Sequence, residues 1–135
     1  MSVTISVLLN TERMPTPTTW QAAIARHGFD VQLDMGVDPA TLSGFWPATY
    51  KGRDAGFEFS LRRVSEGAAA RRFDGRAEFV THADMAETLS AAIAAGVLAD
   101  ISGGVLHDDE AGDEHPGAAA IPWARTVEQD GARYL

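Results

Sequence analysis

The chain has 135 residues and a mass of 14.4 kDa, the usual size of one compact domain, so we take residues 1–135 as a single globular domain. Its 45% hydrophobic and 22% charged residues are typical of a globular protein and argue against disorder. A net charge of -8 disfavours nucleic acid and anionic membrane surfaces as partners. The absence of cysteine excludes disulfides, thiolate metal sites and cysteine nucleophiles.

The sequence predicts neither export nor a membrane span. Residues 1–10 lack a basic leader region, so we expect no secretory signal. The longest mostly apolar stretch, Met85 to Leu98, is interrupted by polar residues, and we expect it to be too short to cross a bilayer. Together with the lack of cysteine, these features predict a cytoplasmic protein.

The first quarter of the chain predicts a β-α-β unit. Apolar and polar residues alternate over 2–9 and again over 29–34, as they do in strands with one buried face. Between them, Thr16 and Pro17 form a favourable N-cap and first-turn pair for a helix over 17–27.

The rest of the chain predicts further strands and two more helices. Residues 65–75 fit a helical turn or a loop equally well, and residues 108–117 are expected to form a loop. The other expected elements are a helical turn over 38–42, strands over 45–50, 56–64, 76–81 and 105–107, a helix over 84–95 that can continue to 101, and a last helix over 118–129. This order predicts an α+β protein with a single mixed β-sheet of five or six strands and two or three helices packed mainly on one face.

Acidic residues gather in the last part of the chain, where ten acids stand against two arginines after residue 80. Half of these acids fall in the expected loop, and such a run is usually a solvated surface segment. As a functional site it would form a negative patch that attracts a basic protein. The candidate partner-binding acids are Asp108, Asp109, Glu110, Asp113 and Glu114.

The same segment carries His107 and His115, and this leaves an alternative open. Imidazoles beside carboxylates can bind a transition metal, so residues 107–115 could serve a small metal-binding or hydrolytic enzyme. The spacing fits neither an EF-hand loop nor a His-Glu-x-x-His helix, so we predict no metal site and no cofactor. The third hypothesis is a homodimer of unknown role.

No group of residues in the sequence has the spacing of a catalytic site. A Gly-x-Ser-x-Gly elbow is missing, and the histidines are scattered, so we predict no catalytic residues and no enzyme. A set of arginines could bind phosphate or carboxylate, although a solvated strand face explains them as well. These arginines are Arg62, Arg63, Arg71, Arg72 and Arg76.

Two tryptophans next to prolines complete the candidate partner site. Trp46 precedes Pro47 and Trp123 follows Pro122, and we expect both tryptophans to be partly exposed anchors for a partner. The neighbouring Phe57 is expected to fill the core instead.

Several short stretches give the chain a family resemblance. They are Met14-Pro15-Thr16 with Trp20-Gln21, Gly44-Phe45-Trp46-Pro47, the run GRDAGFEF from Gly52 to Phe59, and Ile101-Ser102-Gly103-Gly104-Val105 with Asp108. In these the chain resembles a group of small acidic bacterial proteins, mostly uncharacterised, some of which are similar to immunity proteins of polymorphic toxin systems. The resemblance implies a non-enzymatic intracellular binding protein, such as an immunity protein that neutralises a basic toxin.

Overall fold

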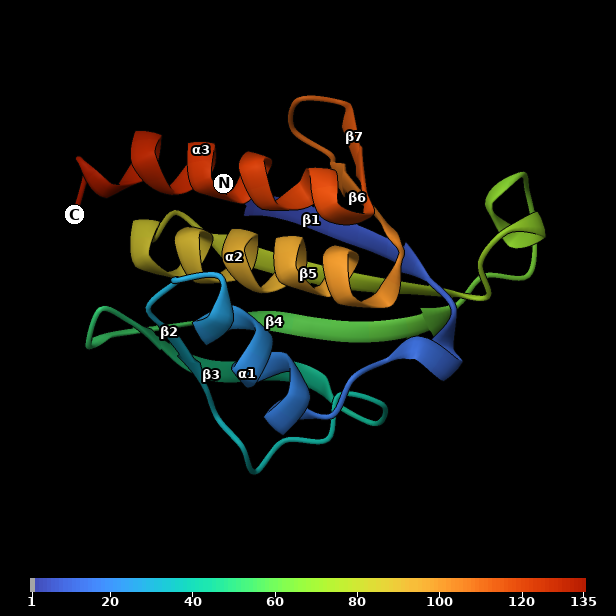
Figure 1. The fold of residues 1–135 in the computed structure, drawn as a ribbon, viewed down its shortest axis with the longest axis horizontal. Coiled ribbons are helices and arrows are strands. Elements are labelled where there is room, and N and C mark those ends of the chain that lie inside the picture. Colours follow the sequence, from blue (N-terminus) through green and yellow to red (C-terminus); the bar gives the residue numbers. More distant parts are fainter. Residues whose placement is uncertain (1) are drawn as a thin grey trace.

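The computed structural model describes residues 2–135 as an α+β fold with one antiparallel sheet of seven strands and three α-helices (Figure 1). The strands are β1 (Ser2–Leu9), β2 (Val31–Leu33), β3 (Ser43–Tyr50), β4 (Arg53–Arg63), β5 (Gly75–His82), β6 (Val105–Asp108) and β7 (Asp113–Pro116). The helices are α1 (Pro17–Arg26), α2 (Met85–Ser102) and α3 (Ala120–Ala132). The α+β class with a single sheet is therefore confirmed.

The sheet differs from the prediction in direction and in strand number. The strand order is β2-β3-β4-β5-β1-β6-β7, and every neighbouring pair is antiparallel, so the expectation of a mixed sheet was wrong. The two strands of the opening β-α-β unit are not neighbours, because β1 lies between β5 and β6 while β2 lies at the far edge. The expected five or six strands become seven because residues 113–116, expected in a loop, form β7.

All three helices cover one face of the sheet, with α2 between α1 and α3 (Figure 1). The period of two along each strand sends alternate side chains beneath the helices. In β1 these are Ile5, Val7 and Leu9, and in β5 they include Ala77 and Phe79. Within residues 2–135 no α-helix covers the opposite face.

Helix α2 is the central element of the core. Asp84 caps it by accepting a hydrogen bond from the Glu87 backbone N–H at 2.9 Å, and Gly103 ends it in the left-handed conformation at φ 69°. The helix runs the full 18 residues to Ser102, with a mean hydropathy of 1.3. It is thus long and apolar enough to span a bilayer, contrary to the expectation from the sequence, but 72% of it is buried inside the protein, as in a core helix.

Trp46 lies in the core, so its prediction as a partly exposed anchor was wrong. The register of β3 turns Trp46 toward the helices and leaves Pro47 on the open face, and the Trp46 side chain is fully buried. Its indole Nε1 donates to the Asp34 carbonyl at 3.0 Å, and its ring meets Trp20 edge-to-face at 5.2 Å. Phe57 is buried beside it, as expected.

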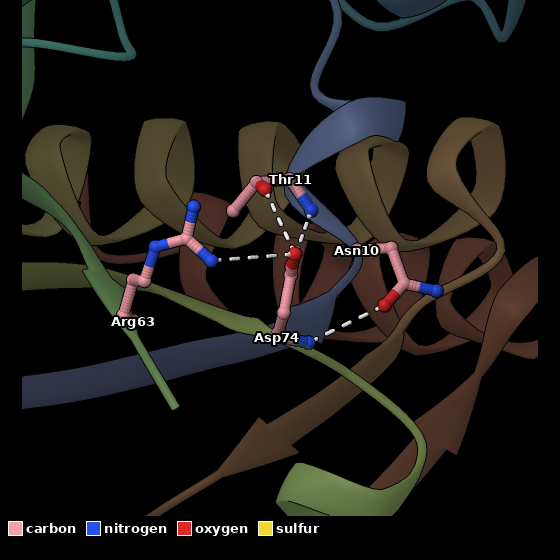
Figure 2. A network of polar contacts seen from close by, with 4 residues as sticks. All are labelled: Asn10, Thr11, Arg63 and Asp74. Atoms are coloured by element: carbon pink, nitrogen blue, oxygen red, sulfur yellow. Dashed lines mark hydrogen bonds and ion pairs between the residues drawn. The ribbon is translucent and has the colours of Figure 1, made fainter. Parts of the chain in front are cut away.

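The long loop between β4 and β5 is fixed at its end by Asp74 (Figure 2). The Asp74 carboxylate accepts hydrogen bonds from the Thr11 N–H at 2.7 Å and the Thr11 hydroxyl at 3.1 Å. Arg63 Nη1 lies 3.8 Å from the same carboxylate, and the Asp74 N–H donates to the Asn10 side chain at 3.3 Å. The network therefore joins the end of β1 to the loop that enters β5.

Candidate functional site

The acidic segment is an ordered hairpin rather than a loose loop. Strands β6 and β7 pair from Val105 with Pro116 to Asp108 with Asp113. The Asp108 carboxylate accepts hydrogen bonds from the N–H groups of Glu110 at 3.0 Å and Ala111 at 3.4 Å. Gly112 closes the turn at a φ of 74°, a conformation that favours glycine. The turn geometry thus fixes the backbone that carries the acidic side chains at one end of the sheet.

The five predicted acids do not share one role. Asp108 organises the turn, and Glu114 on β7 lies with its Oε1 3.7 Å from His107 Nδ1 on β6. The side chains of Asp109, Glu110 and Asp113 are exposed, and within residues 2–135 none of them takes part in a hydrogen bond or ion pair. We call these three side chains the acidic tip.

The acidic tip stands out against the other acids after residue 80. Among the other acidic residues after residue 80, and within the described chain, only Glu87 has a carboxylate without a hydrogen-bond or ion-pair partner. Glu87 lies in the first turn of α2. The others are occupied: Asp84 by the helix cap, Asp100 by His27, Asp108 by the turn, Glu114 by His107, Glu128 by Tyr50 and Asp130 by Arg133. The unpaired negative charge of this region is therefore concentrated at the tip.

The predicted arginine cluster is partly neutralised by its neighbours. Arg62 Nε lies 3.3 Å from Glu78 Oε1 across β4 and β5, and Arg63 pairs with Asp74. Arg72 stacks on the ring of Phe73, with 5.1 Å between the guanidinium carbon and the ring centroid. No glycine-rich phosphate loop accompanies these arginines, so the cluster gives no sign of a phosphate-binding loop.

Trp123, unlike Trp46, lies beside the hairpin. Its ring and that of His115 on β7 are 5.7 Å apart, with 32° between their planes. Trp123 is partly buried against the core and projects from α3 toward the inner face of β7. The structure therefore places one of the two predicted tryptophans beside β7, on the hairpin that carries the acidic tip.

The two histidines of the segment cannot act together. His115 is opposite Leu106 on the inner face of the hairpin, whereas His107 is opposite Glu114 on the outer face. Within the described residues no group of three or more His, Cys, Asp or Glu side chains has the arrangement of a metal site. The geometry thus gives no support to a metal centre built on both imidazoles.

One arrangement could not be predicted from the sequence. Ser6, His107 and Glu114 lie side by side on the outer face across β1, β6 and β7. The Ser6 hydroxyl is fully buried and has no hydrogen-bond partner, so it is not bonded to the His107 imidazole and the row is not a proton relay. Only the strand register brings these residues together, and no spacing in the sequence signals it.

Unpartnered polar atoms mark the same end of the sheet. In the described part of the chain, the buried side-chain atoms without a hydrogen bond are Ser6 Oγ and His115 Nε2. Such groups are rare in folded proteins, and each costs stability. Ser6 lies on β1 beside β6, and His115 lies on β7 within the β6–β7 hairpin.

Comparison with protein-family models, with curated proteins and with solved structures finds no match for this chain.

Proposed function

We propose that this chain is a non-catalytic, cytoplasmic binding protein that uses the acidic tip of the β6–β7 hairpin to dock a basic protein, as an immunity protein docks a toxin. The observation that carries the proposal is the concentration of unpaired carboxylates on one hydrogen-bonded hairpin. Unpaired charges gathered at a protruding point raise the rate of encounter with a partner of opposite sign.

Trp123 supports the same surface. Large aromatic side chains beside a charged rim are the usual source of binding energy in interfaces, while the charges themselves act mainly on the association rate. Trp123 is partly exposed and contacts β7 through His115. The contact surface we propose therefore consists of the acidic tip and Trp123.

The sheet edges favour recognition through side chains rather than strand addition. The edge strands β2 and β7 have 3 and 4 residues, and Pro116 in β7 has no N–H to offer. Short, charged or proline-bearing edges are devices that prevent pairing between sheets. A homodimer built by joining these edges is therefore a weaker proposal than a side-chain interface.

The experiment that tests the proposal is site-specific photo-crosslinking in the source cell. A benzophenone side chain at Ala111, in the turn, should crosslink to a basic protein, which mass spectrometry then identifies. The same side chain at Ala25, exposed on α1 and distant in sequence from the hairpin, is the matched control. A crosslink to the same basic protein from both positions, or only to acidic proteins from Ala111, would refute the proposed docking surface.

A further inference from the structure

A small pocket opens on the outer face of the sheet, between the β6–β7 hairpin and the loop that joins β4 to β5. Its volume is about 210 Å³. This is several times the roughly 30 Å³ of one water molecule but below the roughly 300–1,000 Å³ of sites for drug-sized ligands. The space thus suits a molecule of metabolite size.

The floor of the pocket is apolar. Leu8 and Val105, paired across β1 and β6, face the open side of the sheet, yet each is only 6% exposed. Phe73, from the end of the loop, completes the apolar lining. An aliphatic or aromatic group could therefore be buried here with a gain of about 25 cal/mol for each Å² of apolar surface removed from water.

The two sides of the pocket carry opposite charges. Arg72 lines it from the loop and has no ion pair among residues 2–135. Glu114 lines it from β7, and its only ionic neighbour in that range is His107 at 3.7 Å, longer than a hydrogen bond. A guanidinium without an ion pair and a carboxylate with only a long contact to His107 thus stand on different elements around one apolar floor.

We infer that this pocket binds a free α-amino acid with an apolar side chain. The ligand carboxylate would bind the Arg72 guanidinium, the ammonium would bind Glu114, and the side chain would rest on Leu8 and Val105. Neither a simple carboxylic acid nor a simple amine would use both charged groups.

The neighbouring His107 can change its partner when such a ligand binds. When an ammonium group takes the Glu114 carboxylate, the imidazole loses its partner on β7. Directly across on β1 it has the buried, unpartnered hydroxyl of Ser6, and side chains opposite each other on antiparallel strands are within reach of small movements. Ligand binding would thereby give the unpartnered Ser6 hydroxyl a hydrogen-bond partner.

The test is an NMR titration of the full chain, in which amide shifts are followed at Leu8, Phe73, His107 and Glu114. L-leucine should shift these amides in a saturable manner. N-acetyl-L-leucine, which has no ammonium, and L-leucinamide, which has no carboxylate, should each bind about tenfold more weakly or worse, because each loses a charged hydrogen bond. Glycine, which has no apolar side chain, should also bind more weakly.

Matched variants distinguish binding in the pocket from a general effect of surface charge. Arg72→Gln and Glu114→Gln should each weaken L-leucine binding about tenfold, whereas Arg71→Gln and Glu66→Gln, in the loop between β4 and β5 but not lining the pocket, should leave it unchanged. The amide spectrum of each variant shows whether the fold is kept. Absence of shifts at tens of millimolar L-leucine, equal binding of N-acetyl-L-leucine, or equal loss in the control variants would overturn the inference.

Discussion

The indole of Trp123 on α3 and the imidazole of His115 on β7 lie 5.7 Å apart with their planes tilted by 32°, and this contact joins the last helix to the hairpin that carries the acidic tip. Through it, the hairpin is supported from its inner face by a side chain that α3 holds in place. The position of the tip thus depends on the packing of α3, although no residue of the tip touches the core.

Trp46 and Trp123 should differ strongly in their effect on stability. Trp46→Ala removes a fully buried indole and should cost about 3–5 kcal/mol, a large part of the total stability of a small domain. Trp123→Ala should cost less, because that side chain is only partly buried. Urea unfolding followed by circular dichroism measures both. Equal losses would contradict the placement of the two side chains.

Acid should weaken the clamp at Asp74. Its hydrogen bond from the Thr11 N–H lowers the pKa of the Asp74 carboxyl, with further lowering by the Thr11 hydroxyl and Arg63, against an opposing effect of burial. Because the folded pKa is the lower one, the stabilisation is present above the unfolded pKa near 4 and is lost as pH falls through the folded pKa.

Asp74→Asn should therefore be less stable than the parent at pH 7, and the difference should shrink below about pH 4. Thermal melts across this range measure it. Glu66→Gln, in the same loop and without a hydrogen bond or ion pair in the described chain, is the control and should leave the profile unchanged. A pH-independent difference for Asp74→Asn would show that the clamp does not act through the carboxylate charge.

Alkali should weaken the contact between Tyr50 and Glu128. Burial raises the pKa of the Tyr50 hydroxyl well above its usual value, and the hydrogen bond to Glu128 at 2.8 Å raises it further. The stability that this neutral hydroxyl contributes is fully present below the unfolded pKa near 10 and is lost as pH rises toward the folded value.

Tyr50→Phe should cost about 1–2 kcal/mol at pH 7, because Glu128 loses its donor. Above about pH 10 the variant should approach the parent in stability, since it has no hydroxyl to ionise. Chemical unfolding at pH 7 and at the alkaline end measures this change. A deficit that grows with pH would contradict the assigned contact.

Metal ions should leave the protein unchanged. With His107 and His115 on opposite faces of the hairpin, Zn²⁺, Ca²⁺ and Mg²⁺ at modest excess should not alter the melting temperature. A specific ion at a hundredfold excess over its Kd would add about 2.7 kcal/mol, which a melt detects easily. A rise with one ion alone would revive the metal-binding alternative.

The sequence predicted most elements but not their arrangement. Alternation over 2–9 and the cap at Thr16 correctly located β1 and the start of α1, because both signals are local. Strand order depends on pairings distant in sequence, such as β1 with β5 and β6, which no local pattern encodes. For the same reason Trp46 was misplaced, since the register of β3 decides which of Trp46 and Pro47 faces the helices.

The candidate site was predicted in part. The acidic residues and Trp123 could be named from composition and neighbours. The sequence could not distinguish the unpaired acids of the tip from Asp108 and Glu114. These two residues have partners within the chain, and only the hairpin geometry shows them. The pocket lined by Arg72 and Glu114 was also missed, since its parts come from three distant segments.

The most direct test of the proposed function is the association rate of the crosslinked partner, purified and measured at two ionic strengths. The variant Asp109→Asn/Glu110→Gln/Asp113→Asn should associate about tenfold or more slowly at low salt and lose most of its salt dependence. The control Glu12→Gln/Asp54→Asn/Glu66→Gln changes the net charge equally at exposed positions elsewhere and should keep most of the parent rate. Equal slowing by both variants, or an unchanged rate for the tip variant, would contradict the assignment of the acidic tip as the docking surface.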